Sequence, residues 1–541
     1  MTFPLAFREW VSYGLRLFKA KGHTNRAGLS GLFYTSSWVF MADLTREEVE
    51  DILNQLKEYK ERMEAEAELE EDQEEKEEEV PEEEEVPEEE ETPEEEETPE
   101  EEETPEEEET GDEETSPDEV EAKEEEENEE EVDETPHLQN RDLAGLDLSN
   151  LNFYGIDLSG STLAGTKLAD SEMTECLLND VDLSKAELMD CILNDAQLNR
   201  ANLSEANLER ADLRRAKLHE ANLSKANLNE SILNKADFLK ANLSRASMNN
   251  ADLSRANFKN ADMSGTDLSD SKLSIGVFYE TNLREANMVR AEIKGAKMFG
   301  ADFNKARLTR ADFTGADLSE AQLTEADITR AKFNGAILRR TNLEGSDLSE
   351  CNLNIADLNG AILLKVKLEG AQMNRTKLNN ANLKGAYLRG VNLSRAKLGN
   401  ANLEGVDLSD ANLEGANFNA ANLDGSDLSR AHMPEAVLEQ TSMKNVALTG
   451  ANLRKAKLDK SNLEGADLAG AKLKGASLVG TKLKGADLHR AEIDQANLSQ
   501  ADLSDANLTG AKLNEANLTG AKLEGARLEG AELANVKGYT P

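Results

Sequence analysis

Few side chains in this 541-residue chain have the types and spacing that catalysis requires. Metalloenzymes and many hydrolases carry His, Cys, Asp or Glu side chains in short motifs of fixed spacing. Three histidines of the long C-terminal part, His219, His432 and His489, lie far apart, and none belongs to such a motif. We therefore expect no enzymatic activity, no bound metal and no cofactor.

The element that positions nearly every other side chain is a five-residue repeat, which runs from Arg141 to Asn535 without a change of phase. We number its positions one to five. Position three is Leu, Phe, Met or Ile in every repeat, and position one is mostly Ala. Position five is Gly or a polar residue almost everywhere, and positions two and four are mostly polar.

A period of five excludes an amphipathic helix. Five residues advance an α-helix by about 140° beyond a full turn, so the leucines would spiral around every face. In an extended chain, positions one and three point to the same side. Position five must then turn the chain, and glycine tolerates the positive φ that such turns require. The repeat therefore predicts a solenoid with a narrow core of stacked Ala and Leu side chains.

Repeats such as Ala201–Glu205 (ANLSE) and Ala466–Gly470 (ADLAG) resemble those of the pentapeptide repeat family. The resemblance covers about three-quarters of the chain, residues 136–541. It implies an all-β solenoid, namely a right-handed, four-sided β-helix with four repeats per coil. Residues 136–541 would then form about 20 coils.

The three cysteines all occupy position one of a repeat, at Cys176, Cys191 and Cys351. At that position they replace Ala as small apolar residues. We expect them to be free thiols, as is usual in a reducing compartment.

Four repeats per coil would stack Arg290, Arg310 and Arg330 in one ladder at the spacing of neighbouring strands. Such a ladder repels itself unless carboxylates or other anions offset the charge. One interpretation is local pairing with Glu and Asp side chains on adjacent corners. The other is a docking patch for an acidic partner, a role that the chain's own acidic segment could fill.

That acidic segment comprises residues 67–135. Residues 41–140 carry six basic and 53 acidic side chains, and residues 80–109 consist of five units of sequence VPEEEE or TPEEEE. Proline in every unit excludes a long helix, and dense like charge keeps a chain expanded. We predict a disordered acidic linker that acts as a solvating spacer. The alternative is a polyanion that binds cations or a surface, for which Glu without a fixed cage is a weak ligand.

Residues 1–66 form a separate N-terminal module. Its first 42 residues hold both tryptophans of the chain, with phenylalanines and basic residues around them. One interpretation is a small helix that packs on the open end of the solenoid or on itself. The other is attachment to a membrane surface or a particle. The candidate attachment residues are Phe3, Phe7, Trp10, Phe18 and Trp38.

A helix is predicted to follow, because Thr45–Glu48 (TREE) is a capping box. An apolar stripe with spacings of three and four continues from it. This stripe could pair with a second copy as a short coiled coil, or pack against residues 1–40. Its members are Val49, Ile52, Leu53, Leu56, Tyr59 and Met63.

The two ends of the solenoid differ in sequence. Large residues replace Ala at position one of the opening repeats, which predicts an N-terminal cap over the core. These residues are Arg141, Leu146, Leu151 and Ile156. No similar signal follows Val536, and exposed coil edges pair readily with other chains. We therefore expect end-to-end self-association.

Together these features predict a non-enzymatic scaffold, in which a rigid rod is tethered by an acidic linker to an attachment module. We expect a cytoplasmic protein that binds other proteins, with residues 1–42 as the route to a membrane surface or particle. Nucleic acid is not an expected partner. The resemblance also implies an alternative, because some pentapeptide repeat proteins are DNA mimics that modulate type II topoisomerases. Their rods are strongly acidic, whereas this one is close to neutral.

Overall fold

The structure is a computed structural model that describes residues 44–77 and 137–539. The chain divides into two compact units, one of Met1–Thr35 with Asn54–Pro136 and one of Ser36–Leu53 with His137–Pro541. The predicted attachment residues and most of the predicted linker lie outside the described residues. They therefore stay predictions.

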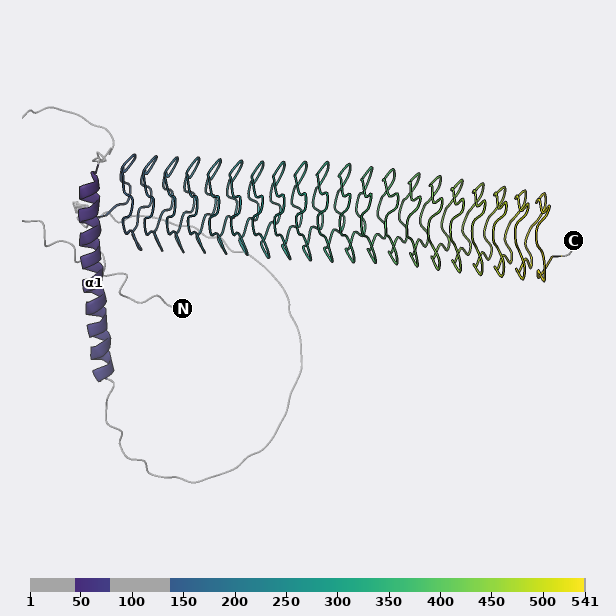
Figure 1. Ribbon diagram of the computed structural model, residues 1–541. Coiled ribbons are helices and arrows are strands. Elements are labelled where there is room, and N and C mark those ends of the chain that lie inside the picture. The colour runs from purple at the N-terminus through teal and green to yellow at the C-terminus, as the bar shows by residue number, and fades with distance from the viewer. Residues whose placement is uncertain (1–43, 78–136, 540–541) are drawn as a thin grey trace, which may run out of the picture. The chain divides into compact units, whose positions relative to one another are not determined.

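The helix α1 extends over Arg46–Glu77 (Figure 1), so its predicted start at the capping box is confirmed. The backbone N–H of Thr45 donates to Glu48 Oε2 at 2.7 Å, and the N–H of Glu48 donates to Thr45 Oγ1 at 3.3 Å. Donation by Thr45 lowers the pKa of the Glu48 carboxyl. The helix continues past the boundary at residue 66, because its Glu-rich continuation holds no proline before residue 81.

The first turns of α1 belong to the same compact unit as the repeats. Val49 is fully buried, and Leu44, Ile52 and Leu53 pack beside it against the repeat core. The Arg46 guanidinium donates to the carbonyl oxygens of Asp147 at 2.9 Å and Ser149 at 3.3 Å. The N-terminal turns thus cover the opening repeats.

This packing bears on two sequence-based interpretations, the coiled coil and the N-terminal cap. Among the described residues, Val49 and Ile52 pack against the repeat core and not against a second helix, so these residues give no support to a coiled coil. The cap predicted from large position-one residues is present, since Leu146, Leu151 and Ile156 pack partly buried against the core. The helix adds to this cap because the first coil has no preceding coil to cover it.

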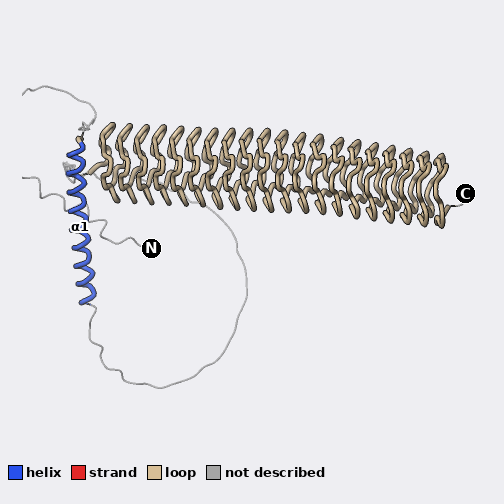
Figure 2. The backbone as a smooth tube through the Cα atoms, in the orientation of Figure 1, coloured by secondary structure: helices blue, strands red, loops and turns tan. Residues whose placement is uncertain are grey.

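Residues 137–539, which we call the repeat domain, form stacked coils (Figure 1). Parallel β-bridges join position-two residues that are 20 apart, from Asp142↔Thr162 to Asn517↔Lys537. Twenty residues correspond to four repeats. These bridges are isolated, and no longer strand occurs in the described residues (Figure 2). The reason is that each repeat turns after about three extended residues, which leaves room for one bridge.

The core consists of positions one and three. Leu203 and Ala201 are fully buried, as are their equivalents in nearly every repeat before residue 520. Phenylalanines at position three stack between coils, with ring centroids 4.8 Å apart for Phe238 and Phe258 and 5.0 Å for Phe258 and Phe278. Identical positions in successive coils therefore share one environment.

Candidate partner-binding surface

Residues at position five stack in columns along the repeat domain. The N–H of nearly every one donates to a carbonyl of the next coil, as from Arg290 to Thr309 at 3.1 Å and from Arg310 to Thr329 at 2.9 Å. Residues 20 apart therefore lie directly above one another. The structure thereby brings the three predicted arginines into neighbouring coils. We call the set Asp270, Arg290, Arg310, Arg330 and Glu350 the arginine column.

Four members of the arginine column line a groove of about 360 Å³, namely Arg290, Arg310, Arg330 and Glu350. Its wall is formed by the position-four residues that precede the arginines. They are Val289, Thr309, Thr329 and Ser349. The groove thus offers guanidinium groups on one side and short hydroxyl side chains on the other.

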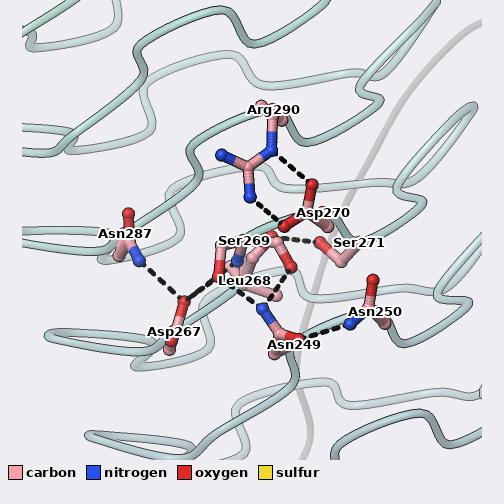
Figure 3. A network of polar contacts seen from close by, with 9 residues as sticks. All are labelled: Asn249, Asn250, Asp267, Leu268, Ser269, Asp270, Ser271, Asn287 and Arg290. Atoms are coloured by element: carbon pink, nitrogen blue, oxygen red, sulfur yellow. Dashed lines mark hydrogen bonds and ion pairs between the residues drawn. The ribbon is translucent and has the colours of Figure 1, made fainter.

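The outer arginines of the column are each held by a carboxylate. Arg290 binds Asp270 through Nε at 2.6 Å and through Nη2, and Figure 3 shows this two-pronged pair. Arg330 binds Glu350 through Nε at 2.8 Å and Nη2 at 3.0 Å. Donation from the guanidinium groups lowers the pKa of both carboxyls. The offsetting carboxylates lie within the column, not on adjacent corners as the sequence suggested.

Arg310 differs from both neighbours, because it makes no ion pair within residues 44–77 and 137–539. Its groove neighbours Thr309 and Thr329 donate their hydroxyls to Asp327 at 2.9 and 2.8 Å. Arg307 also has no ion pair in the described chain, but it is joined by a β-bridge to Asp327, whose charge is opposite. The groove consequently keeps one uncompensated guanidinium, which suits a single carboxylate or other oxyanion.

A profile of pentapeptide repeats, in eight copies, matches the chain in stretches from residues 156–195 to residues 501–537. These stretches cover well over half of the chain. The chain belongs to the pentapeptide repeat family. Because pentapeptide repeat proteins fold as right-handed β-helices, the expected β-helical solenoid is confirmed.

Two pentapeptide repeat proteins of known structure are similar to the chain in sequence. HetL, involved in heterocyst differentiation regulation in the cyanobacterium Nostoc sp. strain PCC 7120, is 35% identical over 42% of this chain and 87% of its own, with a TM-score of 0.17. A protein from the Arabidopsis thaliana thylakoid lumen is 31% identical over 18% of this chain and 66% of its own, with a TM-score of 0.17.

Full-length QnrB1, a plasmid-mediated fluoroquinolone resistance protein, is 17% identical over 48% of this chain and 94% of its own, with a TM-score of 0.11. TM-scores this low carry no argument, and the family assignment rests on sequence. No curated protein sequence matches the chain.

Sequence reasoning missed two residues beside the arginine column. Ile275 and Ile355 occupy position five in the next column. The other members of that column are Gly or polar residues. Both isoleucines are exposed. The signal was present in the sequence, since an apolar residue at position five departs from the repeat.

Many other polar side chains of the pentapeptide repeats join neighbouring coils. Asn222 Nδ2 donates to Asn202 Oδ1 at 3.1 Å, and Asn242 Nδ2 donates to Asn222 Oδ1 at 3.2 Å, in a ladder across coils. His219 Nε2 lies 2.8 Å from Asp237 Oδ2, and His432 Nδ1 lies 3.2 Å from Asn452 Nδ2. In the described ranges no three His, Cys, Asp or Glu side chains are placed to hold a metal ion. Nor does any helix there have the length and apolar character needed to cross a membrane.

The three cysteines are free and buried, as their position in the repeat predicted. Desolvation by burial is the main cause that raises the pKa of the Cys176 and Cys351 thiols to about 12, and that of Cys191 to about 11. Each therefore stays protonated, and unreactive as a nucleophile, in the folded chain.

We predict a pH dependence from these thiols. An unfolded thiol, with a pKa near ~8.5, loses its proton before the folded one does. Above that pH the native state binds more protons than the unfolded state, so the free energy of unfolding falls as pH rises. Denaturant unfolding between pH 7 and 10 measures this fall. The free energy of unfolding should fall less steeply with pH in a chain with all three cysteines changed to Ala than in the natural chain. Rapid labelling of the native thiols at pH 8 would contradict this account.

Proposed function

We propose that this protein is a non-enzymatic scaffold whose repeat domain binds an acidic protein partner in the groove of the arginine column. The repeat domain is proposed as a four-sided β-helix of about 20 coils, because its bridges join residues four repeats apart. Such a solenoid is a stiff, extended surface suited to protein contacts.

The observation that carries the proposal is that Arg310 has no ion pair in the described chain. Two arginines of the column are neutralised by Asp270 and Glu350, while Arg310 between them has no described ion pair. Stacked like charges repel, so an unpaired arginine between two others favours the binding of an added anion. The unpaired guanidinium lies in a groove, with its forked donors available to a carboxylate.

Arg310→Gln tests this function. We expect the variant to weaken the binding of polyglutamate by about tenfold, the size of effect that a lost charge-assisted hydrogen-bond pair produces. The matched control is Arg245→Gln, because Arg245 is also an exposed position-five arginine without a described ion pair. Fluorescence anisotropy of labelled polyglutamate with the full chain gives both affinities. Equal weakening by the two variants would show non-specific attraction and defeat the proposal.

Attachment through residues 1–42 and a cytoplasmic, membrane-peripheral location are also proposed. Phe7, Trp10 and the basic residues around them support this idea by composition. Full chains carrying Phe7→Asp and Trp10→Asp should no longer sediment with vesicles of phosphatidylglycerol and phosphatidylcholine. If the unchanged chain does not sediment with them, the attachment proposal fails for membranes.

The second function, modulation of a type II topoisomerase by DNA mimicry, requires a carboxylate-rich rod. The arginine column offers the opposite charge. A gyrase supercoiling assay with the full chain decides between the two, because inhibition that survives Arg310→Gln would favour DNA mimicry.

A further inference from the structure

Ile275 and Ile355 have a positive φ that the fold imposes at position five, although nothing in the fold requires an isoleucine there. Their φ angles are +63° and +64°, and they are the only β-branched residues with positive φ in the described chain. β-Branched side chains are strained there, whereas Gly, Asn and Asp are tolerated. Burial does not offset the strain, because the two residues are 55% and 60% exposed. Two exposed isoleucines at positions where the fold gains nothing from them therefore indicate a contact surface.

Both isoleucines lie in one position-five column, and we call the nine-residue stretch of it from Lys235 to Arg395 the isoleucine column. Two basic residues stand at each end, one isoleucine follows inside each basic pair, and three glycines form the centre. In order, it contains Lys235, Arg255, Ile275, Gly295, Gly315, Gly335, Ile355, Arg375 and Arg395. The four basic residues are exposed and make no ion pair among the described residues.

The glycine centre is open and lies beside the arginine column. A Cβ atom added to Gly295, Gly315 or Gly335 would meet nothing within 4 Å. Each glycine follows one of Arg290, Arg310 and Arg330 by one repeat, in the same coil. A ligand that covers the glycines therefore passes alongside the three guanidinium groups.

The surface between the two columns is balanced in charge in these coils. The Nζ atoms of Lys294 and Lys332 lie 3.7 and 3.4 Å from Asp312 Oδ2. Lys294 Nζ also lies 3.8 Å from Glu292 Oε2. The attraction for an anion thus comes from Arg310 and from the basic ends of the isoleucine column. The apolar attraction comes from Ile275 and Ile355.

The spacing of the isoleucines defines the ligand. They are four coils apart, or about 19 Å at the distance between neighbouring strands. A polyproline II chain rises ~3.1 Å per residue, so side chains six residues apart are also about 19 Å apart. The matching ligand has two apolar residues six apart, carboxylates between them and carboxylates outside them. The chain itself contains this sequence at residues 77–91, EEEVPEEEEVPEEEE, with its valines at Val80 and Val86.

We propose that the isoleucine and arginine columns together bind residues 77–91 of a second copy of this chain. Val80 and Val86 contact the two isoleucines, and the four glutamates between them cover the glycines beside Arg290, Arg310 and Arg330. The outer glutamates then meet the basic ends of the column. This inference rests on the proposed docking function and specifies the partner.

The test uses a fluorescent peptide with the sequence of residues 77–91 and a full chain in which Val80→Ser and Val86→Ser remove the internal competitor. We expect Ile275→Asn and Ile355→Asn each to weaken peptide binding about fivefold, while the melting temperature stays equal or rises because Asn tolerates positive φ. Ile192→Asn is the matched control, since Ile192 is an exposed isoleucine outside both columns. The control should bind as the parent chain does.

Sedimentation velocity of the natural chain completes the test. We expect concentration-dependent self-association that high salt and the double isoleucine variant abolish. Peptide binding that ignores both isoleucines would overturn the inference, and so would a monomer at all concentrations. If polyglutamate binding still depends on Arg310 in that case, the proposed docking function stands and only the identity of the partner is wrong.

Discussion

Phe258→Ala is expected to lower the free energy of unfolding of the repeat domain by about 3–5 kcal/mol, the usual cost of an emptied core position. Phe258 is fully buried and lies between the rings of Phe238 and Phe278. Its loss removes contacts in three successive coils. Because a solenoid is stabilised by nearest-neighbour contacts, we expect unfolding to separate into two transitions around this coil.

Two controls isolate the contribution of stacking. Phe258→Leu keeps most of the volume and introduces the commonest position-three residue, so it should cost less than ~1.5 kcal/mol. Phe418→Ala empties an equally buried position that has no described aromatic partner. Its cost should be smaller than that of Phe258→Ala by about 0.5–1.5 kcal/mol. Denaturant unfolding followed by circular dichroism measures all three, and equal costs for the two alanine variants would show that stacking contributes nothing.

Val49→Asp is expected to detach the N-terminal cap at a cost of about 3 kcal/mol, because it places an unpaired charge against the repeat core. Val49 is fully buried there, beside Ile52 and Leu53. The opening repeats should then lose protection from hydrogen exchange, and their exposed edge should promote association.

The control for Val49→Asp is Glu47→Gln, a charge change at an exposed residue of the same helical turn. Its effect should stay within a few tenths of a kcal/mol. Hydrogen exchange of residues 141–160 is the measurement that separates the two variants. Unchanged protection in Val49→Asp would mean that α1 does not cap the repeats in solution.

Local periodicity made the solenoid predictable. A small residue at position one and a large apolar residue at position three can share a side only in an extended chain, and position five must then turn. Those constraints act within one repeat, so they are visible in any stretch such as Ala201–Glu205. The 20-residue register is a property of the closed coil and came from the family resemblance, which the bridges now match.

Contacts between distant residues were less predictable. The sequence predicted the start of α1 because a capping box is local, but not the burial of Val49 against repeats that begin some ninety residues later. The three arginines were found because they recur every 20 residues, yet which of them lacks a partner depends on Asp270 and Glu350 two coils away from Arg310. The isoleucines were missed because a search for charged and catalytic residues passes over apolar ones.

Arginine-specific modification with phenylglyoxal, mapped by mass spectrometry, tests the central claim most directly. In the free full chain, Arg310 should react faster than Arg290 and Arg330, whose guanidinium groups are held by Asp270 and Glu350. Added polyglutamate should protect Arg310 and leave Arg245 as reactive as before. Protection of Arg245 equal to that of Arg310 would contradict a specific acid-binding groove in this pentapeptide repeat protein.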